Sequence, residues 1–244
     1  MIDSSPFGFG DPLATRYTEI ERVVSPYREQ VEYPSLMRAL GQVRGASALD
    51  LGCGFGPFTR LLRRQGAAQV LGVDASSEAV QAARRLERQH PIGVRYQVHD
   101  IAALPLLGTF DVITAANVLH YADRRETLRR MCECAFTNLA PGGRLLALVA
   151  NPYLRPGEPQ FNGFVLHRPA QPPDGYAFDV TLPVTPPVKL TVHHWSCEAY
   201  EEVLGECGFT DLTWEPMVGL PEDGPHRPVS LLIGAHRPLG RPDR

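Results

Sequence analysis

Between residues 46 and 151, short apolar runs alternate with segments of helical periodicity, and this alternation limits the folds that the chain can adopt. The segments between the runs place apolar side chains along one helix face. Strands joined by helical crossovers pair in parallel, and the helices then cover both faces of the sheet. The pattern predicts a doubly wound α/β core over residues 46–151. The runs that we expect to form strands are residues 46–51, 70–74, 94–98, 110–115 and 145–150.

The alternation stops after Asn151, where the chain becomes rich in proline and glycine. We expect residues 152–195 to form a small antiparallel β cap, inserted after the fifth strand to bind the substrate. Residues 196–237 read as one helix and two strands, which would complete a mostly parallel, seven-stranded, Rossmann-like sheet. The strand-like pieces of the cap are residues 161–166, 176–182 and 189–195.

The two ends of the chain lie outside this pattern. Residues 1–45 read as a loose arm followed by two lid helices. The first helix is expected to end at Ser25 and Pro26, because proline disfavours a helical interior, and the second to begin at Pro34, a good first-turn residue. The tail, residues 238–244, is expected to be disordered.

Composition narrows the class of protein. The chain of 244 residues is 43% hydrophobic and 21% charged, with a formal net charge of −3, so a basic surface for nucleic acid is missing. No apolar run reaches the roughly 18 residues of a spanning helix, and no secretory signal opens the chain. The five cysteines include no Cys-x-x-Cys pair. We therefore expect a cytoplasmic protein with reduced thiols, no metal, and neither nucleic acid nor membrane as a partner.

A glycine-rich segment between the first strand and the first crossover helix is the strongest functional signal. Residues 49–57 read Leu-Asp-Leu-Gly-Cys-Gly-Phe-Gly-Pro, a turn that lets a ligand approach the backbone. Asp74 ends the next strand, about where an acidic residue meets the ribose hydroxyls of a nucleoside. Together these features predict a nucleoside-cofactor site.

The same segment distinguishes between cofactors. In the dinucleotide pattern G-x-G-x-x-G the last position is glycine, but here Pro57 occupies it. Asp50 would repel a pyrophosphate, whereas it suits the sulfonium and ammonium groups of S-adenosylmethionine. An NAD-dependent oxidoreductase therefore stays as the weaker alternative.

With these motifs the chain resembles a class I S-adenosylmethionine-dependent methyltransferase over residues 46–151. Within that family it is most similar to toxoflavin synthase-like small-molecule enzymes, through residues 50–56, Gly66-Ala67-Ala68, Trp195-Ser196, Tyr200 and Gly208-Phe209. The motifs that carry the family resemblance are residues 49–56, Gly72-Val73-Asp74, His99-Asp100-Ile101, residues 110–113 and residues 139–143.

The resemblance implies cofactor contacts. Gly52 and Gly54 would pass close to the methionine and ribose parts, Asp50 would hold the ammonium group directly or through water, and Asp74 would bind both ribose hydroxyls. Asp100 would accept a hydrogen bond from the adenine amino group. The remaining implied contacts are a backbone donor from Ile101, the backbone carbonyl of Asn117, and Tyr17 and Ala75.

Methyl transfer needs an aligned acceptor, and it needs a base only if the acceptor is a hydroxyl or a protonated nitrogen. His120 follows the fourth strand at the ligand-binding edge, and His193 and His194 are neighbours on a strand, so one of them can face the cleft. His120 and His193 are the catalytic candidates, with a structural role as the alternative for each. The candidate substrate contacts are Tyr33, His120, Asn151, Phe161, His194 and Trp195.

The sequence as a whole predicts a monomeric or homodimeric methyltransferase that acts on a nitrogen or oxygen of a heteroaromatic or phenolic metabolite, in secondary-metabolite biosynthesis. The prolyl motif of DNA amino-methylating enzymes is missing after the fourth strand, where Asn117-Val118-Leu119-His120 stands. A cyclase or scaffold that binds S-adenosylmethionine without transferring the methyl group remains an alternative.

Overall fold

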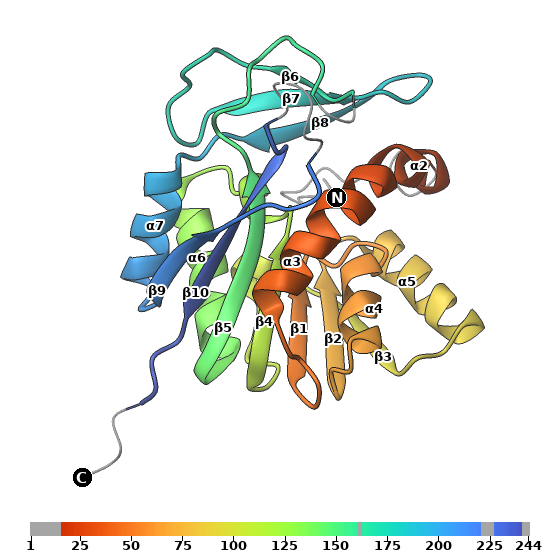
Figure 1. Ribbon diagram of the computed structural model, residues 1–244, viewed down its shortest axis with the longest axis vertical. Coiled ribbons are helices and arrows are strands. Elements are labelled where there is room, and N and C mark those ends of the chain that lie inside the picture. Colours follow the sequence, from red (N-terminus) through yellow and green to blue (C-terminus); the bar gives the residue numbers. More distant parts are fainter. Residues whose placement is uncertain (1–15, 161–162, 221–226, 241–244) are drawn as a thin grey trace, which may run out of the picture.

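A computed structural model describes residues 16–160, 163–220 and 227–240. A seven-stranded sheet in the order β3-β2-β1-β4-β5-β10-β9 forms its centre (Figure 1). The first five strands pair in parallel, whereas β10 runs antiparallel to both of its neighbours. The predicted sheet class is confirmed. The strands are β1 (Ser47–Leu51), β2 (Gln69–Asp74), β3 (Val94–Val98), β4 (Phe110–Ala116), β5 (Leu139–Ala150), β9 (Thr210–Glu215) and β10 (Ser230–His236).

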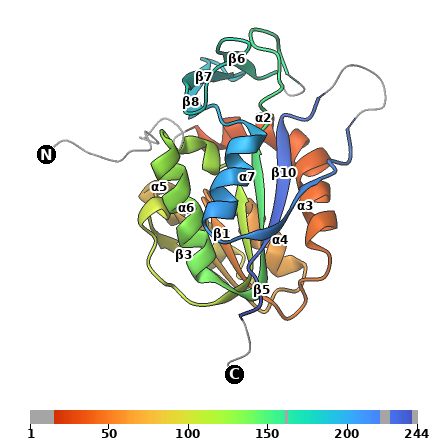
Figure 2. The ribbon, with the colours of Figure 1, turned by 90° about the vertical axis from the view of Figure 1, so that its left-hand side faces the viewer.

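Helices cover both faces of the sheet, because each crossover presents one apolar stripe to it. Figure 2 shows α6 and α7 on one side and α3 and α4 on the other. One buried cluster, with Met131 and Tyr200, lies under the first pair, and another, with Leu36 and Leu62, lies under the second. The helices are α3 (Tyr33–Leu40), α4 (Pro57–Arg64), α5 (Ser77–Gln89), α6 (Arg125–Asn138) and α7 (Cys197–Glu206), with short 3-10 turns η2 (Ile101–Ala103) and η3 (Leu119–Tyr121).

The lid differs from the prediction. Helix α2 (Tyr17–Tyr27) contains Pro26 and continues through a π-helical segment η1 (Arg28–Glu32) into α3. The predicted end at Ser25 and Pro26 is therefore wrong. Tyr27 and Val31, just beyond the proline, are buried, and this tertiary packing outweighs the local cost of proline. The predicted arm and the proposed start of the first helix at Leu13 lie outside the described residues.

The inserted segment forms the expected second sheet. Strands β6 (Val165–His167), β7 (Ala177–Leu182) and β8 (Val188–His193) pair antiparallel in that order. Figure 1 shows this cap above the carboxyl ends of the main strands, beside α2. The domain boundaries that we drew at 45, 151 and 195 stay predictions. Of the proposed disordered tail, residues 241–244 lie outside the described residues.

None of the helices that the structure describes combines the length and the apolar character needed to cross a bilayer.

Candidate active site

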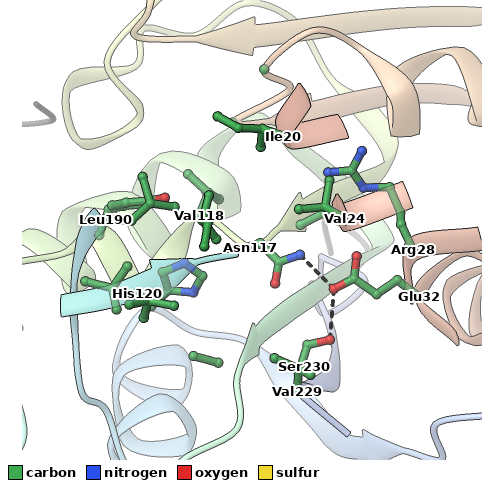
Figure 3. Close-up of a pocket in the computed structure, with 18 of the residues that line it drawn as sticks. Ile20, Val24, Arg28, Glu32, Asn117, Val118, His120, Leu190, Val229 and Ser230 are labelled. Atoms are coloured by element: carbon green, nitrogen blue, oxygen red, sulfur yellow. Dashed lines mark hydrogen bonds between the residues drawn. The ribbon is translucent and has the colours of Figure 1, made fainter. Parts of the chain in front are cut away.

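A cavity of about 360 Å³ lies between the carboxyl edge of the main sheet and the cap. Its floor comes from the loops after β1 and β4 and from the ends of β2 and β10, and its roof comes from α2, η1 and the cap. Figure 3 shows residues of α2, η1, the loop after β4, the cap and β10 around this cavity. Ligands of open α/β sheets bind at this edge.

The glycine loop forms one end of the floor. Gly52 has a φ of +68°, and a Cβ atom there would lie 2.5 Å from Cγ2 of Val118. Both the backbone conformation and this close approach require glycine. The Cys53 amide donates to the carbonyl of Val73 at 2.9 Å, which fixes the loop to β2. Gly54 also lines the cavity, as its predicted role in cofactor binding requires.

Asp74 lines the cavity beside the loop. Its carboxylate accepts hydrogen bonds of 2.8 Å from the backbone amides of Gly54 and Ser76. Burial raises the pKa of Asp74, and these two bonds oppose the rise. Ala75, the next residue, lines the cavity too. The carboxylate is thus positioned at the cavity wall, where the predicted ribose contact requires it.

Asp50 lies beneath the loop and is not part of the cavity lining. It is 1% exposed, and its two oxygens accept hydrogen bonds from the hydroxyls of Thr59 at 2.7 Å and Thr114 at 2.8 Å. Burial raises the pKa of this carboxyl to about 6, against the opposing effect of the two hydroxyls. Asp50 is therefore placed to act on a cationic ligand through its charge, from behind the loop.

Ile101 lines the cavity, whereas the carboxylate of Asp100 accepts a hydrogen bond of 2.9 Å from the Ala102 amide and caps η2. Asn117 follows β4 in a left-handed conformation with a φ of +57°, which asparagine tolerates better than most residues. Its side chain donates to Glu32 at 2.8 Å. The predicted adenine contact of Asp100 and the backbone contact of Asn117 stay predictions.

His120 is the predicted catalytic residue that lines the cavity. It is 8% exposed, and its Nδ1 atom has no hydrogen-bond partner among the described residues. Burial, with a smaller effect of His193, lowers the pKa of His120 to about 4, so the ring is neutral at neutral pH and can accept a proton. His193 lies outside the lining, and burial lowers its pKa as well.

The structure places two of the predicted substrate contacts in structural roles. The indole of Trp195 is 4% exposed, packs in the main core and donates to the carbonyl of Ala122 at 3.1 Å. Asn151 donates to the carbonyl of Pro228 at 2.7 Å and anchors the start of the cap. Neither residue lines the cavity.

Tyr33 packs edge-on against Phe58, with ring centroids 4.8 Å apart, and His194 is half-buried. Neither of them lines the cavity. Phe161 and the side chain of Tyr17 lie outside the described residues. Of the six predicted substrate contacts, His120 is the one that lines the described part of the cavity.

A polar cluster that we did not predict lies where the lid meets β10. Arg28 donates two hydrogen bonds, of 2.8 and 2.9 Å, to the carboxylate of Glu21. Glu32, 6% exposed, accepts from Asn117 and from the Ser230 hydroxyl at 3.0 Å (Figure 3). Glu21, Arg28 and Glu32 are spaced seven and four positions apart, so they lie on one helix face. Charged residues at this spacing are also typical of a helix face exposed to solvent.

The lid is tied to the cap above the cavity. The guanidinium of Arg16 donates to the carbonyl of Pro186, and the Thr185 amide donates to the carboxylate of Glu19 at 2.9 Å. Below these bonds, Ile20 packs against the apolar cluster that contains Leu182. The roof is therefore assembled from two segments that are far apart in the sequence.

Comparison with known proteins identifies the core. Residues 48–143 match the methyltransferase domain family. The ubiquinone biosynthesis O-methyltransferase of Coxiella burnetii is 30% identical over 110 residues, which cover 45% of each chain. The corresponding protein of Nitrobacter winogradskyi is 35% identical over 119 residues, which cover 47% of this chain and 42% of the relative. The chain thus spans about two fifths of the length of the curated relatives it matches.

Solved structures extend the similarity beyond the core. An S-adenosylmethionine-dependent methyltransferase from Mesorhizobium loti is 25% identical, with a TM-score of 0.59, and the match covers 84% of this chain and 97% of that one. A second such enzyme, from Clostridium acetobutylicum, shares the fold at 14% identity, with a TM-score of 0.66 over 92% and 98% of the two chains. The narrower resemblance to toxoflavin synthase-like enzymes stays a prediction. Residues 48–143 thus carry the methyltransferase domain, and the fold around them is that of the class I S-adenosylmethionine-dependent methyltransferases.

Proposed function

We propose that this protein transfers a methyl group from S-adenosylmethionine to a nitrogen or oxygen of a small, flat acceptor, heteroaromatic or phenolic. One observation carries the proposal: a single cavity joins the glycine loop and Asp74 to the apolar inner wall of the cap. A nucleoside cofactor at the first end and an apolar acceptor at the second would meet inside it.

The residues present fit S-adenosylmethionine, the cofactor that the family implies. Among the described lining residues, Arg28 is the one lysine or arginine, and it is paired with Glu21, so a diphosphate would meet little positive charge. Asp74 at the wall and Asp50 behind the loop favour a cationic ligand. Nε of Arg28 and Nδ1 of His120 are buried without partners among the described residues, and a bound ligand would satisfy them.

The acceptor end favours a flat apolar molecule. Burying aromatic surface against such a wall stabilises the complex without fixing one hydrogen-bonding pattern. The name of the Coxiella relative supports oxygen as one acceptor atom. A place in secondary metabolism and in the cytoplasm stays a prediction. The cap and neighbouring residues that form this wall are Leu154, Phe164, Leu166, Phe178, Val180, Leu182, Leu190 and Val192.

Bound S-adenosylmethionine supplies a methyl group that is already activated by the sulfonium. The protein then has to align the acceptor and exclude water, a role that falls to the lid and cap residues that form the roof of the cavity. His120 is neutral because burial lowers its pKa to about 4, so its ring can accept a proton. A base this weak suits an acceptor whose own proton is acidic, such as a protonated ring nitrogen.

Calorimetry with S-adenosylmethionine, S-adenosylhomocysteine and NAD tests the cofactor, and transfer of an isotope-labelled methyl group into a panel of phenols and heteroaromatic amines tests the reaction. Binding of NAD alone would contradict the cofactor assignment. Binding of S-adenosylmethionine without labelled product over that panel would favour a cyclase or scaffold.

With an acceptor in hand, His120→Asn is expected to lower kcat by roughly 10²- to 10⁴-fold if that acceptor must lose a proton. His167→Asn is the matched control, because His167 is exposed on β6 and bonds to Thr181 within the cap. An unchanged kcat in folded His120→Asn would contradict the role as a base.

A further inference from the structure

We infer that Glu32 recognises a cationic amino group on the methyl acceptor, and this inference rests on the proposed function. The residue lines the cavity, yet it is 6% exposed and carries a carboxylate. A buried carboxylate needs hydrogen-bond donors or a positive charge beside it.

One of the two oxygens of the Glu32 carboxylate has hydrogen-bond donors in the structure. Both of its hydrogen bonds, from Asn117 and Ser230, reach the same oxygen, Oε1 (Figure 3). Among the described residues no hydrogen bond reaches Oε2. The side chain is therefore held in a fixed orientation by two neutral donors, while its second oxygen remains open to a ligand.

Arg28, the cationic side chain of the same lid face, is already paired with another carboxylate. Arg28 forms its ion pair with Glu21 at 2.8 Å and none with Glu32 within 4.0 Å. Burial lowers the pKa of Arg28, but the carboxylates of Glu21 and Glu32 outweigh burial and raise it, so the guanidinium is charged. Taken together, Glu21, Arg28 and Glu32 carry one uncompensated negative charge, and a cationic ligand would balance it.

The topology separates this group from the cofactor end. Gly52 and Asp74 belong to the ends of β1 and β2, on one side of β4. Ser230 begins β10, which lies on the other side of β4, beyond β5. Leu154 and Val229 line the cavity at this second side. Asn117, a predicted cofactor contact, follows β4 between these two sides and also bonds to Glu32. The bond from Ser230 places Glu32 toward the acceptor side of that boundary.

Three probes of matched size test the inference: 1-naphthylmethylamine, 1-naphthylmethanol and 1-naphthoate, titrated by calorimetry in the presence of saturating S-adenosylhomocysteine. The amine, a cation at pH 7, is expected to bind at least about tenfold more tightly than the alcohol, and the carboxylate is expected not to bind. Equal affinity for amine and alcohol, preference for the carboxylate, or no binding of the amine would overturn the inference.

Glu32→Gln keeps the shape of the side chain and an oxygen for Asn117 and Ser230. It is expected to reduce amine affinity at least about tenfold and to leave the alcohol within about twofold. Glu29→Gln is the matched control, because it also removes one negative charge from η1 and leaves the Arg28–Glu21 ion pair intact. A loss of the same size in Glu29→Gln would show that the total charge decides amine affinity, and it would overturn a local contact with Glu32.

The cofactor measurement separates the two proposals. Affinity for S-adenosylhomocysteine is expected to stay within about twofold in Glu32→Gln. A large loss would assign Glu32 to the cofactor and overturn the inference while the proposed function stands. If the unaltered protein binds no S-adenosylhomocysteine, the proposed function itself fails. The amine selectivity of the unaltered protein tests the inference even if Glu32→Gln does not fold.

Discussion

The two ends of the cavity are built in different ways. The cofactor end uses two short neighbouring segments, the glycine loop and Asp74. Backbone amides of the loop hold them together by donating to the Asp74 carboxylate and to the carbonyl of Val73. The acceptor end gathers side chains from α2, η1, the cap and β10, which are far apart in the sequence. The first end is therefore fixed by local backbone geometry, whereas the second depends on how three separate units pack together.

Removing most of the cap is the strongest way to test this division. Replacing residues 156–193 with a short Gly-Ser linker keeps the structural residues Asn151 and Trp195. Turnover is expected to be abolished, while affinity for S-adenosylhomocysteine stays within about 1 kcal/mol, because the two ends share few residues. Methyl-transfer assays and calorimetry measure the two effects.

A milder variant guards against misfolding. Leu190→Asp places one charge in the apolar wall and is expected to reduce turnover strongly with the same small effect on cofactor affinity. If either folded variant loses cofactor binding, the cap belongs to the cofactor site and the division of labour is wrong.

Asp74→Ala is expected to weaken S-adenosylhomocysteine binding by roughly 1.5–3 kcal/mol, because it removes charge-assisted hydrogen bonds to the ribose. It also frees the Gly54 and Ser76 amides, so part of the loss comes from the loop. Asp74→Asn retains an oxygen acceptor and should lose less. Calorimetry on both variants checks this order, and unchanged affinity in folded Asp74→Ala would contradict the ribose contact.

Asp50 predicts how cofactor binding depends on pH. Its pKa in the folded protein, about 6, exceeds the ordinary value of 3.8, so between those pH values the folded state holds a proton that the unfolded state has lost. Its contribution to stability therefore decreases as the pH rises through this window. A cationic ligand prefers the carboxylate, so affinity for S-adenosylmethionine is expected to rise by up to about tenfold between pH 5 and 7.

Asp50→Asn is the control for this pH dependence. It fits between Thr59 and Thr114, since their hydroxyls can donate or accept, and it removes the titration. The rise in affinity should flatten in the variant, although the raised pKa of Asp74 leaves a smaller slope. An equally steep rise in Asp50→Asn would assign the pH dependence elsewhere.

The same contrast explains what the sequence could predict. The strand order, the glycine loop and the position of Asp74 follow from local periodicity and short motifs, because parallel strands bring their carboxyl ends to one edge. The helix beyond Pro26 could not be predicted, because burial of Tyr27 and Val31 against distant parts of the chain decides it.

The acceptor end was harder to predict for the same reason. Trp195 and His120 look alike in the sequence, because each is an aromatic ring with a polar nitrogen near the end of a strand. In the structure Trp195 packs in the core, where its N–H donates to the carbonyl of Ala122. His120 lines the cavity, and its Nδ1 atom has no partner among the described residues. Glu32 gives no signal in the sequence, because a charged helix face is usually a solvated one.

The smallest expected effect concerns the bonds between lid and cap. Glu19 is bonded to the Thr185 amide on the cap hairpin and to Arg16 on its own helix, and these bonds lower its pKa. Because the side chain of Glu19 is 37% exposed, these bonds are screened and weak, and Ile20 packs beside them against the apolar cluster of the cap. Glu19→Ala is expected to raise the acceptor KM by about two- to threefold and to leave kcat unchanged.

The pH dependence of this contact has a definite sign. A lowered pKa means that the folded state favours the carboxylate, so the contribution of Glu19 is present at neutral pH and is lost as the pH falls through its titration. The protection factors of the β7–β8 hairpin amides, which correct for the slower intrinsic exchange in acid, should therefore fall on acidification in the unaltered protein. In Glu19→Ala they should be lower already at neutral pH. Glu29→Ala, at an exposed glutamate of the following helical segment, is the control. If Glu19→Ala and Glu29→Ala exchange alike, the apolar contacts alone hold the lid to the cap, and the bond between Glu19 and the Thr185 amide contributes nothing measurable.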